Sequence, residues 1–203
     1  MKAQILLLLS LATLLFLVPA ITAVNPRVYT KNVVTDFIAK VCSTTTKSNV
    51  CYTSLIPSAK IIKVNNLKQL AELSLSGSVV AAKKRVSHMT MLWSQIKNTK
   101  GADKQVLALQ GCVENYRKAI GELEASLAAI TQPEKVDNDE EEEGFNLKME
   151  VDYNLDRAIN VYLPTCPSGF KDLPNESIKA DVFKHTLKLQ DIIKNARELA
   201  SKL

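Results

Sequence analysis

The spacing of apolar residues in the middle of the chain is its most constraining feature. Between residues 66 and 131, apolar side chains recur at every third or fourth position, which places them on one face of a helix. Gly101 divides this stretch into two segments, and Pro133 follows the second. The pattern therefore predicts two long antiparallel helices that share a core. The apolar positions are Leu75, Val79, Ala82, Val86, Met89, Trp93 and Ile96, then Val106, Leu109, Val113, Tyr116, Ile120, Leu123, Leu127 and Ile130.

Two later segments continue the helical period. The third begins near Leu147 and is expected to end at Pro164, and the fourth runs from about Ile178 to Leu203. The third stripe comprises Leu147, Val151, Leu155, Ala158 and Tyr162, and the fourth comprises Val182, Leu189, Ile192, Ala196, Leu199 and Leu203, with His185 on the same face. An inward His of this kind is expected to be a hydrogen-bonded core residue, and His88 is expected to be a solvated flank residue.

The expected fold class is all-α. Residues 64–203 are predicted to form an antiparallel four-helix bundle, and residues 27–60 a helical hairpin that extends from it. Within the hairpin, Pro57 is expected to end the second helix. Strand-like alternation is absent over any long span, and aromatic residues make up only 5% of the chain, which disfavours an all-β fold.

The first 23 residues have the pattern of a secretory signal peptide. Lys2 precedes a 14-residue apolar run from Ile5 to Val18, and small residues then lead to a cleavage position after Ala23. The alternative is a membrane anchor, but the run is shorter than the ~20 residues that span a bilayer. We therefore expect a secreted mature domain, 24–203, with no membrane contact after cleavage. It would reside in the apoplast or cell wall, with the vacuole as the alternative.

The charge of the chain is unevenly distributed. The net charge is +5, and loss of the predicted signal peptide leaves 25 basic and 21 acidic residues. Six of these acids lie in the run 137–143, within a predicted solvated loop, 133–146. The remainder is strongly basic, which suits an acidic partner such as de-esterified pectin, although simple solubility explains it equally well. Calcium binding by the run is a weaker alternative because it lacks EF-hand spacing.

Four cysteines in a secreted chain predict two disulfides. Three pairings are open. Because Cys42 and Cys51 are only nine residues apart, the first choice is Cys42–Cys51 with Cys112–Cys166. The sequence has no closely spaced Cys or His pair of the zinc-finger kind, so neither a metal nor another cofactor is expected. Asn175 begins an Asn-Glu-Ser sequon and is a predicted glycosylation site.

Catalytic patterns are missing from the sequence. It contains no nucleophile elbow, P-loop or dinucleotide fingerprint, and disulfide formation would leave no thiol nucleophile. The basic residues are spread over helix backs without interleaved aromatic residues, so nucleic-acid binding is not expected. We therefore expect a binding protein and not an enzyme.

The contexts of the cysteines carry a resemblance. Cys42 and Cys51 are separated by eight residues, Cys112 begins the run Cys-Val-Glu-Asn-Tyr-Arg-Lys-Ala-Ile-Gly-Glu-Leu, and Thr165 begins Thr-Cys-Pro-Ser-Gly-Phe. In order and spacing these motifs resemble the plant invertase and pectin methylesterase inhibitor family over nearly the whole mature chain. The resemblance implies the same disulfide pairing and the same bundle with a hairpin. It also implies that Thr165, which precedes the fourth cysteine, lies at the contact with the target enzyme.

The family resemblance gives the functional hypothesis. The chain is expected to inhibit a cell-wall carbohydrate enzyme in a one-to-one complex, by occluding its active-site cleft. Pectin methylesterase is the preferred target because residues 144–148 lack the Pro-Lys-Phe element common in invertase inhibitors, and acid invertase (β-fructofuranosidase) is the alternative. A cytokine-like signal and a polysaccharide-binding structural protein are hypotheses from other classes.

Overall fold

A computed structural model describes residues 26–203 except 60, 63, 133–139 and 174–175. The described residues contain helices and no strand, which confirms the all-α prediction. Two units divide the chain, Met1–Asn32 and Val33–Leu203. All the packing below belongs to the second unit. The helices are α2 (Pro26–Cys42), α3 (Ser48–Ala59), α4 (Leu67–Ile96), α5 (Asp103–Thr131), α6 (Glu140–Arg157), the π-helix η1 (Ala158–Tyr162), α7 (Leu163–Ser168) and α8 (Glu176–Ala200).

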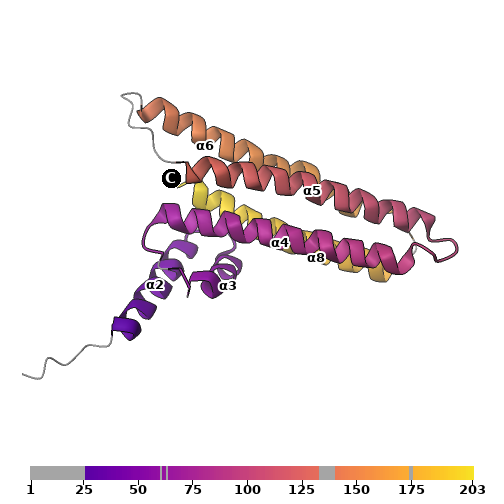
Figure 1. Cartoon of the computed structure of the whole chain (residues 1–203), viewed down its shortest axis with the longest axis horizontal. Coiled ribbons are helices and arrows are strands. Elements are labelled where there is room, and N and C mark those ends of the chain that lie inside the picture. The colour runs from indigo at the N-terminus through magenta and orange to yellow at the C-terminus, as the bar shows by residue number, and fades with distance from the viewer. Residues whose placement is uncertain (1–25, 60, 63, 133–139, 174–175) are drawn as a thin grey trace, which may run out of the picture. The chain divides into compact units, whose positions relative to one another are not determined.

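The bundle is formed by α4, α5, α8 and the continuous segment α6–η1–α7. Figure 1 shows α4 and α5 as a long antiparallel pair, with α8 alongside α4 and α6 alongside α5. The side chain of Asn66 starts α4 by accepting the backbone N–H of Gln69 at 2.9 Å, a helix-capping contact. Gly101 allows the short connection to α5 because its φ of 82° is a conformation that side-chain-bearing residues rarely adopt.

The core of the bundle follows the predicted stripes. Met89 of α4 and Leu109, Tyr116 and Leu123 of α5 are completely buried. Tyr116 also brings a hydroxyl into this core, where it shares a hydrogen bond of 2.7 Å with Thr186 of α8. The hydroxyl of Thr186 bonds in addition to the carbonyl of Val182 at 2.8 Å, so both polar groups are satisfied inside the bundle.

Three expected details of the later helices differ in the structure. Pro164 does not end the third long helix: the chain passes through η1 and continues as α7, where Pro164 occupies the first turn and its missing N–H is not needed. The core register of α8 includes Ile193, which is completely buried, whereas Ile192 is only partly buried. Leu147 and Leu203, which were placed on apolar stripes, are exposed.

Two expected helix limits also need correction. Helix α6 begins at Glu140, inside the segment 133–146 that was expected to be a loop, and residues 133–139 lie outside the described part. Glutamate is a good helix former, and negative charge is favourable in the first turn of a helix. Helix α3 continues past Pro57 to Ala59.

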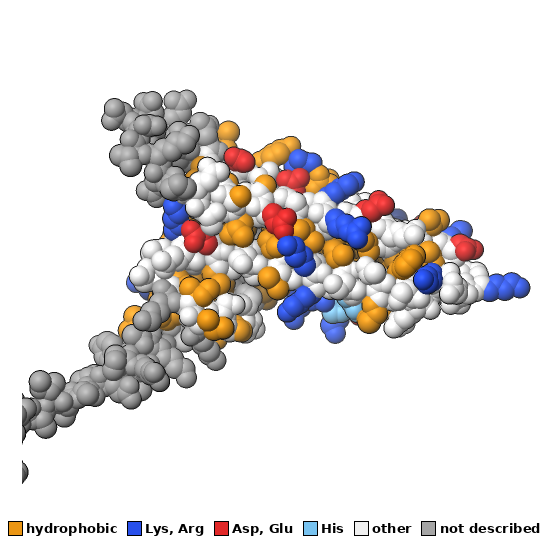
Figure 2. Space-filling model, in the orientation of Figure 1, with side chains coloured by type: hydrophobic (Ala, Val, Ile, Leu, Met, Phe, Trp, Pro, Cys, Tyr) orange, Lys and Arg blue, Asp and Glu red, His pale blue; other side chains and the backbone are white. Residues whose placement is uncertain are grey.

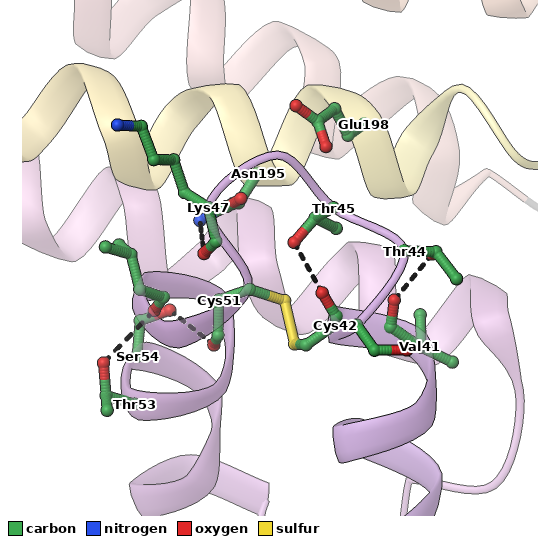
Figure 3. The surroundings of a disulfide bond; sticks show 12 residues. Val41, Cys42, Thr44, Thr45, Lys47, Cys51, Thr53, Ser54, Asn195 and Glu198 are labelled. Carbon is green, nitrogen blue, oxygen red and sulfur yellow. Dashed lines mark hydrogen bonds between the residues drawn. A yellow bond between two sulfur atoms is a disulfide. The ribbon is translucent and has the colours of Figure 1, made fainter.

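The segment between α2 and α3 packs against α8. Cys42 and Cys51 join the two helices by a disulfide, and Figure 3 shows this bond facing α8, where Asn195 and Glu198 lie. The backbone N–H of Thr46 donates to Glu198 at 2.7 Å, and the side-chain amide of Asn195 donates to the carbonyl of Lys47 at 3.3 Å. The hydroxyls of Ser43, Thr44 and Thr45 donate to the last carbonyls of α2, and the carbonyls of Val41 and Cys42 also accept the backbone N–H groups of Thr44 and Thr45.

The two disulfides should contribute unequally to stability. Cys112–Cys166 closes a separation of 54 residues and Cys42–Cys51 one of nine, and the chain-entropy model assigns about 4 and about 2.5 kcal/mol to loops of these sizes. Replacing Cys112 and Cys166 together by Ala should therefore lower the free energy of unfolding more than replacing Cys42 and Cys51. Urea titration of the two double variants measures this, and the opposite order would contradict the assignment.

A separate prediction follows from the hydrogen bond between Tyr116 and Thr186 in the core. Tyr116→Phe should destabilise the fold by about 1 kcal/mol, because one buried hydrogen bond is lost while Thr186 retains its bond to Val182. Tyr52→Phe, at an exposed position on α3, is the control and should change little. Equal denaturation midpoints for the two variants would show that the buried contact contributes nothing.

Candidate target-binding surface

Thr165 lies on a short helix that is covalently attached to the bundle. Its neighbour Cys166 is almost completely buried and bonded to Cys112 in the middle of α5. Immediately before α7, the π-helix η1 closes with the N–H of Leu163 on the carbonyl of Ala158, and the side chain of Gln190 donates to the carbonyl of Ile159 at 3.0 Å. These contacts fix the η1–α7 segment to both α5 and α8.

The outer face of η1 and α7 is exposed. It presents Val161, Pro164, Thr165 and Ser168; Pro164 and Thr165 come three and four residues after Val161, and Ser168 comes three after Thr165, so all four lie on one side of a helix. The hydroxyl of Thr165 donates its proton to the carbonyl of Val161 at 2.7 Å. Its oxygen therefore remains available as an acceptor for an N–H or O–H group of a partner.

Helix α6 is held to its neighbours by two arginines. Arg197 of α8 donates to both carboxylate oxygens of Asp152, at 2.6 and 2.8 Å, and to Asp156 at 2.8 Å. The hydrogen bond from Arg197 lowers the pKa of Asp152 below its ordinary value. Arg157 forms an ion pair of 3.2 Å with Glu122 of α5 and lies over the ring of Tyr153. Charge pairing thus orients the segment that leads into η1.

A second exposed patch lies on the outer side of α6. Met149 and Tyr153 are one turn apart, and both are more than half exposed. With Lys148, Asp152 and Asp156 they line a shallow depression. Tyrosine is frequent at the centres of protein interfaces. The spacing of Met149 and Tyr153 is present in the sequence, but the predicted stripe of this helix runs through Val151 and Leu155, which are buried.

One of the two histidines does not take its expected place. His185 is not in the core: its side chain is 24% exposed and forms an ion pair of 3.1 Å with Asp181, one turn earlier on α8. His88 of α4 contacts the same carboxylate at 2.6 Å. Burial, with the positive charge of Arg85, lowers the pKa of His185. His185 therefore lies at the edge of the α4–α8 seam, where a polar residue can meet water and a carboxylate.

Other sequence predictions fall outside the described part of the chain. Asn175, the signal peptide over 1–23 and the acidic residues before Glu140 belong to this group, so their predicted roles stay predictions. Among the described residues, no helix combines the length and apolar character needed to cross a bilayer.

The fold and the disulfides define a class of protein, a helical bundle closed by two disulfides and carrying an N-terminal helical hairpin. A crystal structure of a pectin methylesterase inhibitor from Arabidopsis thaliana is similar, with a TM-score of 0.51 and 17% sequence identity. The alignment covers 83% of this chain and 96% of that one, and at this identity it establishes the fold alone. No curated protein matches the sequence significantly.

Residues 36–199 match the family model described as plant invertase/pectin methylesterase inhibitor. Because the match covers most of the chain, the protein belongs to this family. Membership supports the role of an inhibitor of plant cell-wall enzymes and fits the expectation that the chain is not itself an enzyme.

The Asp152–Arg197 pair predicts a pH-dependent contribution to stability. Because the folded state lowers the pKa of Asp152 from 3.8, its stabilisation is complete above that value and is lost as the pH falls through the lower folded-state value. Asp152→Asn should therefore destabilise the protein at pH 6 and have a diminishing effect below about pH 4. Since Asp152 is half exposed, the effect should stay below about 1 kcal/mol.

Thermal melts across this pH range compare the variant with the parent chain. Asp172→Asn, which removes an exposed acid outside this network, is the control. A difference between Asp152→Asn and the parent that grew as the pH fell would contradict the sign of this prediction.

Proposed function

We propose that this protein is a secreted inhibitor of pectin methylesterase that occludes the active-site cleft of the enzyme in a one-to-one complex. The observation that carries the proposal is the family match over residues 36–199. The Pro-Lys-Phe element common in invertase inhibitors is missing from residues 144–148, which favours pectin methylesterase over invertase. Acid invertase remains the alternative target.

The mechanism we propose is steric. Inhibition by occlusion needs a surface that loses little conformational freedom when it binds, because ordering flexible segments reduces affinity. The η1–α7 face has this property: Cys166 attaches it to α5, and Gln190 attaches it to α8. Thr165 would then accept a hydrogen bond from the enzyme, with Val161 and Pro164 supplying apolar contact beside it.

The signal-peptide pattern and the basic charge complete the proposal. Secretion would place the inhibitor with its target in the apoplast, or in the vacuole for an invertase. Outside the acidic run the mature chain is strongly basic, so acidic pectin could concentrate it near its target. The sequon at Asn175 would carry a glycan in that compartment.

The proposal is tested by inhibition of both target classes in parallel. The full-length sequence is expressed in a secreting host, and the oxidised product is titrated against a plant pectin methylesterase and an acid invertase near pH 5–6. Saturable one-to-one inhibition of pectin methylesterase alone is expected. Inhibition of invertase alone would reassign the target. Inhibition of neither enzyme by protein with both disulfides formed would remove the inhibitor assignment for these enzymes.

A matched pair of threonine variants tests the proposed contact. Thr165→Ala should weaken inhibition by about tenfold, the effect of one interfacial hydrogen bond, without lowering the melting temperature appreciably. Thr90→Ala is the control, because Thr90 is also an exposed helical threonine whose hydroxyl bonds to the carbonyl four residues earlier. Equal inhibition by the two variants would exclude Thr165 from the interface.

A further inference from the structure

Three potential metal ligands converge at the seam between α4 and α8. His88 comes from α4, and Asp181 and His185 come from successive turns of α8. The Nε2 atom of His88 lies 2.6 Å from one carboxylate oxygen of Asp181, and the Nε2 atom of His185 lies 3.1 Å from the other. The two rings are 5.0 Å apart between centroids, in an edge-to-face arrangement. Both imidazoles therefore direct a nitrogen toward the same carboxylate.

The separations match what a small divalent cation requires. One ligand atom from each residue can be chosen so that all three lie within 4.8 Å of one another. In a tetrahedral zinc site with bonds of 2.0–2.1 Å, the ligand atoms are about 3.3 Å apart. Metal binding would require small side-chain rotations toward that spacing, and each of the three side chains is between 24% and 34% exposed. The same exposure leaves a fourth position open to water.

The composition of the chain makes this group distinctive. His88 and His185 are the two histidines of the entire sequence, and they come together although 97 residues separate them. All four cysteines are in disulfides, so no thiolate competes for a metal. Imidazole and carboxylate together are ligands typical of zinc and copper sites, and not of magnesium.

We propose that His88, Asp181 and His185 form a zinc-class metal site that links α4 to α8, with water as the fourth ligand. This site is separate from the proposed inhibitory surface around Thr165. Bound metal would replace the contacts of the two imidazoles with Asp181 by coordinate bonds to His88 of α4 and to Asp181 and His185 of α8, and so stabilise the folded state in proportion to its occupancy.

Neighbouring positive charge lowers the affinity of the site for a cation. Arg85 and Lys184 act electrostatically on His185 and oppose a cation there, and Figure 2 shows basic side chains beside the exposed histidine surface. Asp181 offsets one of these charges. Because these positive charges lower the affinity for a cation, the titration is made at micromolar protein and metal concentrations. It is made at pH 7.

The test is calorimetric titration of zinc sulfate into untagged, oxidised protein secreted from the full-length sequence. One zinc per chain is expected, and His88→Gln and His185→Gln should each weaken binding at least about tenfold. Asp191→Asn removes an acid elsewhere on α8 and should leave binding unchanged. With zinc at about a hundred times its dissociation constant, the melting temperature should rise by about 5–10 °C.

A second measurement does not depend on folding of the variants. Paramagnetic Cu²⁺ added to the parent protein should selectively broaden the proton signals of both imidazoles. NMR resolves these signals because the chain has only two histidines.

A variant with the acids of 137–143 replaced by their amides should bind zinc as the parent does. The absence of saturable binding, or binding that survives in the double His variant and is lost in the acidic-run variant, would overturn the proposal.

Discussion

Burial of one face of α5 is the constraint on which the rest of the bundle depends. Cys112, Tyr116, Ala119 and Leu123 lie along this face and are completely shielded from water. Helix α4 packs on α5, and α6, η1 and α7 also contact it. Burial of large apolar side chains is worth about 1.5–3 kcal/mol for each of them, so this face supplies much of the energy that assembles the bundle. The disulfide from Cys112 adds a covalent bond at the N-terminal end of this face.

The family signature around Cys112 has a structural explanation in this arrangement. The spacing from Cys112 to Tyr116, then to Ala119 and Leu123, keeps all four residues on one side of the helix. The cysteine holds α7, and the tyrosine reaches Thr186 of α8. In this chain the residues that carry the family resemblance around Cys112 are therefore residues that fix the bundle. The proposed target contacts, by contrast, lie on the exposed face beside Cys166.

The sequence predicted the helical architecture because helical periodicity is a local property that burial reinforces. The stripes of α4 and α5 were predicted well, and Met89 and Leu123 are in the core as expected. The predictions that failed are those in which the structure depends on a contact distant in the sequence or on an unusual backbone conformation. Pro164 is tolerated because a π-turn precedes it, and the position of His185 depends on His88, 97 residues away. The Asp181–His185 spacing was a readable helical signal, but its third partner was not.

The π-turn has a consequence for how the family can vary. A π-helix contains one more residue than an α-helix over the same span, so it corresponds to a single inserted residue. Removing one residue from Ala158–Tyr162 would leave an ordinary α-helical turn over the same span, whereas removing one residue from the regular turns of α6 would rotate everything after it by about 100° around the helix axis. That rotation would turn Cys166 away from Cys112 and carry Thr165 off its present face. A single deletion should thus be tolerated in the π-turn and in the connecting loops but not in α6, because the disulfide and the exposed threonine depend on the register of the helix that leads to them.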